Sequence, residues 1–225
     1  MQTTKGFAFF LFLNVKANPY LFPLVQLIVL ALLFVFQWTN SQLELSLIIN
    51  SWHQPWLDQL CLYGTFLGDG TLIVLICFIV YFYKPELAVG MLFAYLISSG
   101  ITQGLKHTIF AEFHRPLWHI NQLNLQDYYL PIGAEHNLAN SFPSGHTTSA
   151  FAYFCILSLY FKQHYLKIGM LILAFFVAFT RVYLLQHFVM DITVGSIIGT
   201  SVSLWVYYGL YQNGKLKWAI IKTKS

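Results

Sequence analysis

The sequence SFPSGHTTSAFAYFCILSLYF occupies residues 141–161, where a polar segment leads directly into an apolar one. From His146 to Phe161 it contains no aspartate, glutamate, lysine or arginine. A run of this kind is typical of a helix inside a membrane, with residues 143–145 at its amino end. The stretch therefore predicts a spanning helix whose first turn carries polar, reactive side chains.

The composition of the whole chain supports a membrane protein. Of the 225 residues, 57% are hydrophobic and 9% are charged, against about 25% charged residues in a soluble domain. Too few polar side chains are present to cover a soluble surface, and disorder or a polar binding tail is excluded. The charge density is also too low to favour a nucleic-acid partner.

Apolar runs predict six spanning helices in a single domain over residues 1–225. They cover residues 20–38, 61–83, 87–105, 146–161, 168–185 and 188–210. The second run is broken near its start by Gly68-Asp69-Gly70, where we expect Asp69 to cap or turn the chain. Residues 39–58 are too polar to span and are expected to lie along the membrane surface, and residues 7–13 predict a short interfacial helix.

The basic residues predict the orientation of this bundle. With six spans and both termini in the cytoplasm, nine of the 12 basic residues fall on the inner side, as the positive-inside rule requires. These nine are Lys5, Lys16, Lys84, Lys162, Lys167, Lys215, Lys217, Lys222 and Lys224. The other three, Lys106, Arg115 and Arg181, fall on the outer face. Because topology does not require cations there, we expect them to have a specific role.

The chemistry of this outer face favours a phosphate group. Arginine binds phosphate through two parallel hydrogen bonds and lysine acts as a point charge, so Lys106, Arg115 and Arg181 together suit a dianion. The amino end of the predicted helix adds free N–H groups and a favourable dipole. There Gly145 allows close backbone approach, and the Ser144 hydroxyl adds a donor.

Two histidines on the same face have the spacing of a nucleophile and an acid. His187 and Asp191 are four residues apart and so share one face of a helix. A carboxylate there holds one imidazole nitrogen protonated and leaves the other as a nucleophile or base. His146 is then available to protonate a leaving group. These parts describe phosphoryl transfer with no obligatory metal or other cofactor.

This set of residues resembles the type 2 phosphatidic acid phosphatase (PAP2) superfamily. The motifs of that family are Lys-x6-Arg-Pro, Pro-Ser-Gly-His and Ser-Arg-x5-His-x3-Asp. Residues 143–146 match the second in full, and residues 180–191 match the third with Thr180 in place of serine. The first motif departs from the pattern, because eight residues separate Lys106 from Arg115. The resemblance covers about residues 60–210 and implies a six-helix membrane bundle with its site on the extracytoplasmic face.

The resemblance also implies a role for each residue. His187 becomes a phosphohistidine, Asp191 orients it, and His146 protonates the leaving group. The phosphate oxygens are held by Lys106, Arg115, Ser144, Gly145 and Arg181. The two extra residues in the first motif are absorbed as a bulge or as an extra turn beyond the third span. Alternatively, Lys106 merely extends from a helix end towards water.

The function implied is that of a lipid phosphatase in a bacterial inner membrane, facing the periplasm or cell exterior. Its partners are the bilayer and a lipid phosphate. Undecaprenyl diphosphate is the first substrate predicted. Lipid A, phosphatidic acid and phosphatidylglycerol phosphate remain alternatives, because the motifs do not separate them. Two other functions stay open. One is a metal-dependent hydrolase with His146, His187 and Asp191 as ligands, and the other is a non-catalytic lipid-binding or transport protein.

The remaining cysteines, histidines and aromatic residues receive structural predictions. Cys61, Cys77 and Cys155 lack any Cys-x-x-Cys spacing and are expected to be buried, inert thiols. Histidines outside the motifs are expected at loops and interfaces: His107, His114, His119, His136 and His164. Aromatic and apolar residues of the long polar loop are expected to anchor it at the membrane surface: Trp118, Tyr128, Tyr129 and Leu130.

Overall fold

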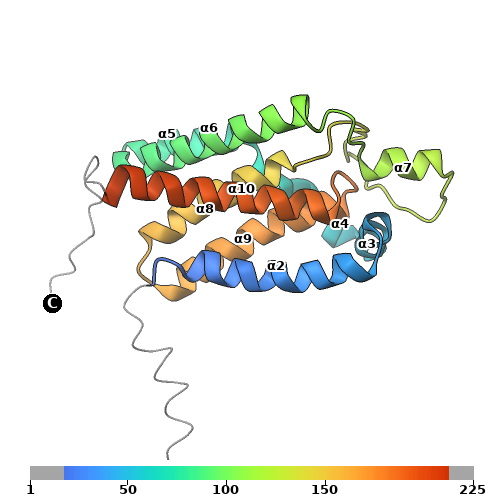
Figure 1. The fold of residues 1–225 in the computed structure, drawn as a ribbon, viewed down its shortest axis with the longest axis horizontal. Coiled ribbons are helices and arrows are strands. Elements are labelled where there is room, and N and C mark those ends of the chain that lie inside the picture. Colours follow the sequence, from blue (N-terminus) through green and yellow to red (C-terminus); the bar gives the residue numbers. More distant parts are fainter. Residues whose placement is uncertain (1–17, 213–225) are drawn as a thin grey trace, which may run out of the picture.

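The computed structural model describes residues 18–212, and between these residues every regular element is a helix (Figure 1). The predicted all-α fold is therefore confirmed. The predicted interfacial helix at residues 7–13 and the basic C-terminal tail lie outside the described residues. In chain order the elements are α2 (Leu21–Thr39), α3 (Gln42–Asn50), α4 (Pro55–Gly64), the 3-10 helix η1 (Thr65–Gly68), α5 (Gly70–Tyr81), α6 (Pro85–Thr108), α7 (Pro116–Gln122), α8 (Gly145–Tyr160), α9 (His164–Tyr183), α10 (Val189–Tyr207) and the π-helical turn η2 (Tyr208–Gln212).

Helix α8, formed by the apolar part of residues 141–161, lies at the centre of the bundle. Twelve of its sixteen residues are buried, and it packs mainly against α6, α9 and α10. Small residues of α10 allow the closest of these approaches. A Cβ atom at Gly199 would lie only 2.4 Å from the Thr148 carbonyl oxygen, so a side chain there would push α10 away from α8. The contact between these two helices positions the candidate site.

Helix α2 lies on the outside of the bundle and presents an apolar surface. Three of its nineteen residues are buried, whereas Leu27, Leu32 and Phe36 are each 60% exposed. Such a continuous apolar face suits contact with lipid rather than water. By length and composition, four helical segments are able to cross a membrane: Leu21–Thr39, Pro85–Thr108, His164–Tyr183 and Val189–Leu210.

A fifth candidate span is the broken pair formed by α4 with η1 and by α5. The segments Pro55–Gly68 and Gly70–Tyr81 meet at an angle of 60°, at the break predicted from the glycines. Asp69 caps α5 as expected, since its Oδ1 accepts hydrogen bonds from the N–H groups of Thr71 (2.8 Å) and Leu72 (3.4 Å). The helix begins at Pro55, six residues before the predicted start, because proline is well tolerated at a first helical position.

The fourth predicted span, residues 146–161, corresponds to α8, which is shorter than the four helical segments named above. Sixteen residues make a helix of about 24 Å, less than the roughly 30 Å hydrocarbon core of a bilayer. The other predicted spans agree with the helices more closely. Helix α2 differs from the predicted residues 20–38 by one residue at each end, and α9 begins four residues earlier than residue 168.

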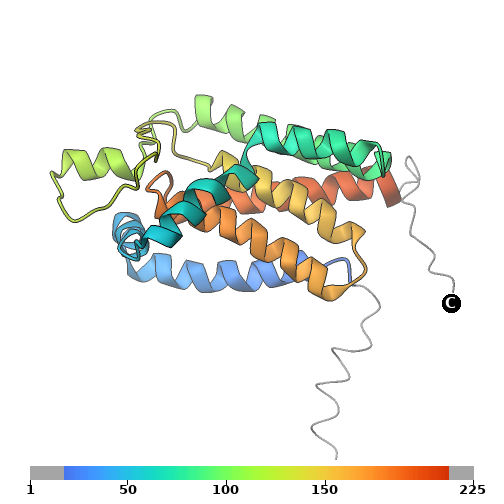
Figure 2. The same ribbon diagram turned by 180° about the vertical axis from the view of Figure 1, so that it is seen from behind.

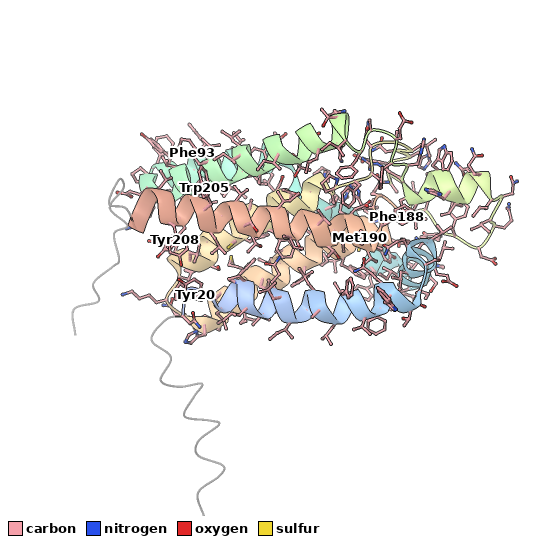
Figure 3. All side chains as sticks on the ribbon, viewed as in Figure 1. Tyr20, Phe93, Phe188, Met190, Trp205 and Tyr208 are labelled. Carbon is pink, nitrogen blue, oxygen red and sulfur yellow. The ribbon has the colours of Figure 1, made fainter. Side chains whose placement is uncertain are left out.

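The two ends of the bundle differ in content (Figures 1 and 2). At one end lie α3, α7 and the turn between α9 and α10, and we call this the site end. Figure 3 places Phe188 and Met190 at the site end, and Tyr20 and Tyr208 at the opposite end. The hydroxyl groups of Tyr20 and Tyr208 form a hydrogen bond, which joins the start of α2 to the end of α10. The chain therefore enters and leaves the described bundle far from the site.

Candidate active site

The Pro-Ser-Gly-His motif forms the amino end of α8 and lies directly against α10. Ser144 is buried, and its N–H donates a 3.1 Å hydrogen bond to the backbone oxygen of Asp191. Its Oγ accepts a hydrogen bond from Thr147 Oγ1 at 3.0 Å. No side chain caps α8, so the first N–H groups of the helix remain available to an acceptor such as a phosphate oxygen.

His187 and Asp191 form a buried pair in which the carboxylate orients the imidazole. His187 Nδ1 lies 3.1 Å from Asp191 Oδ2. The same oxygen accepts hydrogen bonds from Ser141 Oγ at 2.5 Å and from the Phe188 N–H at 3.0 Å. With Nδ1–H donating to the carboxylate, Nε2 carries the free lone pair. Ser141 was not predicted as a site residue, although it stands two residues before Pro143.

The electrostatic environment of His187 keeps its imidazole neutral. Burial lowers the pKa of His187 well below 6.5, and the charges of Arg115, Arg181 and Lys106 lower this pKa further. A neutral imidazole is the form that acts as a nucleophile or base. The same three cations were predicted on the outer face, and their common effect on His187 shows that the fold brings them together.

Arg115 is held in place by the chain on either side of it. Its Nε donates to the Ala139 carbonyl oxygen at 2.9 Å, and its Nη1 donates to Gln186 Oε1 at 2.7 Å. Burial lowers the pKa of Arg115, whereas the Glu135 and Asp191 carboxylates raise it. Gln186 was not predicted, although it directly precedes His187 in the third motif.

Arg181 lies buried near the end of α9, and one of its N–H donors has no hydrogen-bond partner. Its Nη1 donates to Thr65 Oγ1 at 2.7 Å, and its Nη2 lies 3.8 Å from Glu135 Oε2. Its Nε is buried without a hydrogen-bond partner, the only such side-chain nitrogen or oxygen within residues 18–212. A buried, unpaired donor of a charged group is costly. A bound anion would supply the missing acceptor.

Lys106 lies in the last turn of α6, because this helix extends three residues beyond its predicted end at Leu105. The helix thus ends almost one turn later than predicted, and Lys106 lies inside it rather than in the loop that follows. The side chain is only 6% exposed, so it does not extend into water from the helix end. The burial of Lys106 and its effect on the pKa of His187 place it with the two arginines.

His146 faces a pocket of about 430 Å³ at the site end, which we call the His146 pocket. Its polar lining consists of Gln59, Tyr63, Thr65, Asp69, Glu135, His146 and Arg181. Glu135 and Thr65 were not predicted as site residues, because their contacts with Arg181 form only when the chain folds. Asp69, predicted to cap or turn the chain, does so and also lines this pocket.

A second pocket, of about 530 Å³, is bordered by Asp191. Most of its lining surface is apolar, with Phe142, Phe188 and Met190 among the residues that form it, and it reaches Ser141 and Asp191. Figure 3 shows Phe188 and Met190 close together at the start of α10. Asp191 thus borders a pocket of largely apolar surface, whereas His146 lines the other, more polar pocket.

Residues outside the motifs have mainly structural contacts. The three cysteines are free and buried, as predicted. His114 stacks on Trp118 with ring centroids 4.1 Å apart, and burial lowers the pKa of His119. The Tyr129 hydroxyl donates to Asp58 Oδ2 at 3.0 Å, so this tyrosine attaches the long loop to α4.

The residues of the alternative metal site do not form a ligand set. Within residues 18–212, no group of three or more histidine, cysteine, aspartate or glutamate side chains is arranged to hold a metal ion. His187 and Asp191 contact each other, whereas His146 lines a pocket that neither of them lines. Asp191 thus orients the His187 imidazole, and the His146 imidazole is separate from this pair.

Comparison with known proteins gives one family. The family model described as the PAP2 superfamily matches residues 87–215. The chain is 25% identical over 172 residues to a lipid A 4'-phosphatase of Bacteroides thetaiotaomicron, a match that covers 73% of this chain and 74% of the relative. Among solved structures, Aquifex aeolicus LpxE is 26% identical with a TM-score of 0.63, covering 73% of this chain and 93% of that one. A PAP2-type phosphatidylglycerolphosphate phosphatase from Bacillus subtilis, 22% identical with a TM-score of 0.62, shares the fold over 88% of this chain and 97% of its own.

Proposed function

The chain belongs to the PAP2 superfamily, and from this premise we propose that it is an integral-membrane phosphatase acting on a phosphorylated lipid. The observation that carries the proposal is the buried His187–Asp191 pair, whose imidazole is kept neutral among three cations. A neutral nucleophile surrounded by cations suits attack on an anionic phosphate.

In the proposed first step, the lone pair of His187 Nε2 attacks phosphorus. An N–P bond forms while the P–O bond to the leaving group breaks, and the bond electrons pass to the leaving oxygen. His146 donates a proton to that oxygen. Asp191 accepts the Nδ1–H hydrogen bond throughout and stabilises the positive charge that develops on the imidazole.

The phosphate oxygens are held by the remaining candidate residues. Arg181 Nε, which has no partner in the protein, donates to one phosphate oxygen. The N–H groups of Gly145 and of the next residue of α8 donate to a second phosphate oxygen. Lys106, Arg115 and the Ser144 hydroxyl complete the set proposed for binding. Their charges oppose the negative charge of the transferring phosphoryl group.

In the second step, water hydrolyses the phosphohistidine. His146, now without its proton, takes one from the attacking water, and the new P–O bond forms as the N–P bond breaks. Inorganic phosphate leaves and both histidines return to their starting protonation states. Every charge change is met by a side chain of this protein, so we propose a reaction that needs no metal.

Two features support a substrate whose tail stays in the bilayer. The apolar pocket at Phe142, Phe188 and Met190 borders the Ser141–Asp191 contact, and the outer helices present apolar faces. The lipid A 4'-phosphatase relative favours a lipid phosphate monoester such as a phosphorylated lipid A. Undecaprenyl diphosphate, the first substrate predicted from the sequence, stays a prediction, as do phosphatidic acid and phosphatidylglycerol phosphate.

We propose that the protein is a single domain with six membrane-spanning segments, of which α8 is the short central one. We also propose that it lies in a bacterial inner membrane. Both termini lie in the cytoplasm and the site faces the periplasm or cell exterior. The connections α5–α6 and α8–α9 support this orientation, because they lie at the end opposite α7 (Figure 1) and carry Lys84 and Lys162.

Phosphate release from the purified full-length protein in detergent tests the proposed function. The panel consists of phosphorylated lipid A, phosphatidic acid, phosphatidylglycerol phosphate and undecaprenyl diphosphate, each with and without excess chelator. We expect release that persists in chelator and disappears in the His187→Ala variant. His107→Ala is the matched control, because His107 is exposed and lines neither pocket.

Each alternative function has its own outcome in this assay. Loss of activity in chelator, with recovery on adding a divalent metal, would support the metal-dependent hydrolase. Lipid binding without phosphate release from any substrate would support the non-catalytic binding or transport protein. Full turnover by His187→Ala would show that the proposed nucleophile is wrong.

A further inference from the structure

Resting on the phosphatase function proposed above, we infer that Glu135 is a specificity-determining residue. Its carboxylate favours lipid phosphate monoesters over lipid diphosphates. The observation is that this acidic side chain lines the pocket that contains His146 and lies 3.8 Å from Arg181.

The direction of the reaction decides which pocket receives the leaving group. In phosphoryl transfer the attacking and leaving atoms lie roughly in line on opposite sides of phosphorus. His187 is buried against Asp191 on one side. His146, the proposed proton donor to the leaving group, lines the His146 pocket. The bond to the leaving group therefore points into the His146 pocket.

Glu135 is held in this pocket by both its backbone and its side chain. Its carbonyl oxygen accepts a 2.6 Å hydrogen bond from Gln186 Nε2, and Gln186 in turn accepts from Arg115. Its carboxylate lies 3.8 Å from Arg181 Nη2. Its charge also raises the pKa of Arg115. The carboxylate thus acts on two of the three cations of the site.

The two substrate classes place different charges beside this carboxylate. Cleavage of a monoester releases an alcohol, which is neutral once His146 has protonated it. Cleavage of the terminal phosphate of a diphosphate releases a lipid phosphate, which keeps at least one negative charge. Asp69 lines the same pocket, so an anionic leaving group meets two carboxylates there. Like charges at this range repel, and the diphosphate is disfavoured.

The expected size of the effect is moderate because water reaches Glu135. Its side chain is 62% exposed, and exposed charges are screened by solvent and salt. We expect the ratio of kcat/KM for a diphosphate to kcat/KM for a monoester to rise about tenfold when the charge is removed, which corresponds to about 1.4 kcal/mol.

The experiment compares farnesyl phosphate with farnesyl diphosphate, which share one tail and differ only in the phosphate group. Initial rates of phosphate release are measured for the full-length protein in detergent. Glu135→Gln is expected to raise the diphosphate-to-monoester ratio about tenfold, whereas Glu135→Asp, which keeps the charge, is expected to leave the ratio near that of the wild type. The rise of the diphosphate-to-monoester ratio in Glu135→Gln, relative to the wild type, is also expected to be smaller at high salt than at low salt.

Asp127→Asn is the matched control, because it makes the same carboxylate-to-amide change on an exposed residue of the same loop that lines neither pocket. An unchanged ratio in Glu135→Gln, or an equal rise in Asp127→Asn, would overturn the assignment. Because only the ratio is compared, a variant that folds less completely loses activity on both substrates and leaves the ratio unaffected.

The assay separates this inference from the proposed function. If the wild-type protein releases phosphate from both substrates and His187→Ala from neither, the phosphatase proposal stands whatever Glu135→Gln does. If the wild type releases phosphate from neither farnesyl compound nor any lipid of the panel, the phosphatase proposal fails and the specificity inference fails with it.

Discussion

Two buried carboxylates lie at the site end of the bundle, and their partners differ. Asp191 accepts from a histidine, a serine and a backbone N–H. Asp58 accepts from the hydroxyl groups of Tyr129 and Tyr183, at 3.0 and 2.5 Å. Both are buried and both are hydrogen-bonded, so these properties alone do not mark a catalytic carboxylate. The difference is that Asp191 contacts an imidazole beside three cations, whereas Asp58 joins a loop to two helices.

The largest expected effect separates these two carboxylates. Asp191→Asn removes the charge that orients His187 and stabilises it when phosphorylated, so kcat is expected to fall about 10⁴-fold, as in other Asp–His pairs. Asp58→Asn is expected to change kcat less than about threefold and to lower the midpoint of thermal unfolding by about 3 °C. Phosphate release and a thermal melt of both variants provide the check. Similar losses of kcat in the two variants would show that Asp191 is not catalytically different from Asp58.

The second prediction concerns the unpaired donor of Arg181. Arg181→Lys keeps the positive charge but removes the Nε–H and the planar pair of donors. We expect kcat/KM to fall about 100-fold. Loss of the Nε–H should not affect thermal stability, because it has no protein partner, whereas loss of the Nη1 hydrogen bond to Thr65 should lower the midpoint of thermal unfolding by a few degrees. Steady-state kinetics and a thermal melt measure the two effects. A wild-type value of kcat/KM in this variant would show that Arg181 does not bind phosphate through the planar N–H donors of its guanidinium group.

A third prediction concerns Lys106 and the extra turn of α6. Lys106→Met removes the charge while keeping a long apolar chain, so the helix end is preserved. We expect kcat/KM to fall about tenfold, as for the loss of one charge-assisted hydrogen bond. Lys84→Met, at the other end of the bundle, is the matched control and should retain wild-type kinetics. Equal activity in both variants would mean that Lys106 has no part in binding.

The smallest effect is a shift in pH dependence. The nucleophile must be neutral, so activity is present above the pKa of His187 and is lost as pH falls through it. Because the Arg115 charge lowers this pKa, Arg115→Gln should raise it, and the acidic limb of the kcat/KM profile should move up by about half a pH unit. Asp58→Asn should leave the limb in place. A downward shift in Arg115→Gln would contradict the proposed electrostatics.

Much of the site was predictable because its key residues lie close together in sequence. His187 and Asp191 are separated by one helical turn, and residues 143–146 lie at a helix start that the following apolar run reveals. The spacing of apolar residues likewise predicted α2 to within one residue at each end. Local periodicity and short motifs were sufficient in these cases.

The residues that escaped prediction are those whose contacts are distant in sequence. Glu135 and Thr65 meet Arg181 across 46 and 116 residues, and Gln186 meets Arg115 across 71. No periodicity marks such pairs, because they form only when the loop and the broken helix fold back on α9. The extra turn of α6 was left open for a similar reason, since polar residues at its end resemble the start of a loop.

In the proposed reaction, phosphate becomes covalently attached to His187. The most direct measurement is a rapid alkaline quench of the protein during turnover of farnesyl phosphate, followed by peptide mass spectrometry. An alkali-stable phosphate on the peptide containing His187, absent from His187→Ala and present in His107→Ala, is the predicted result. Phosphate on another residue, or phosphate release at the wild-type rate by His187→Ala, would contradict the account.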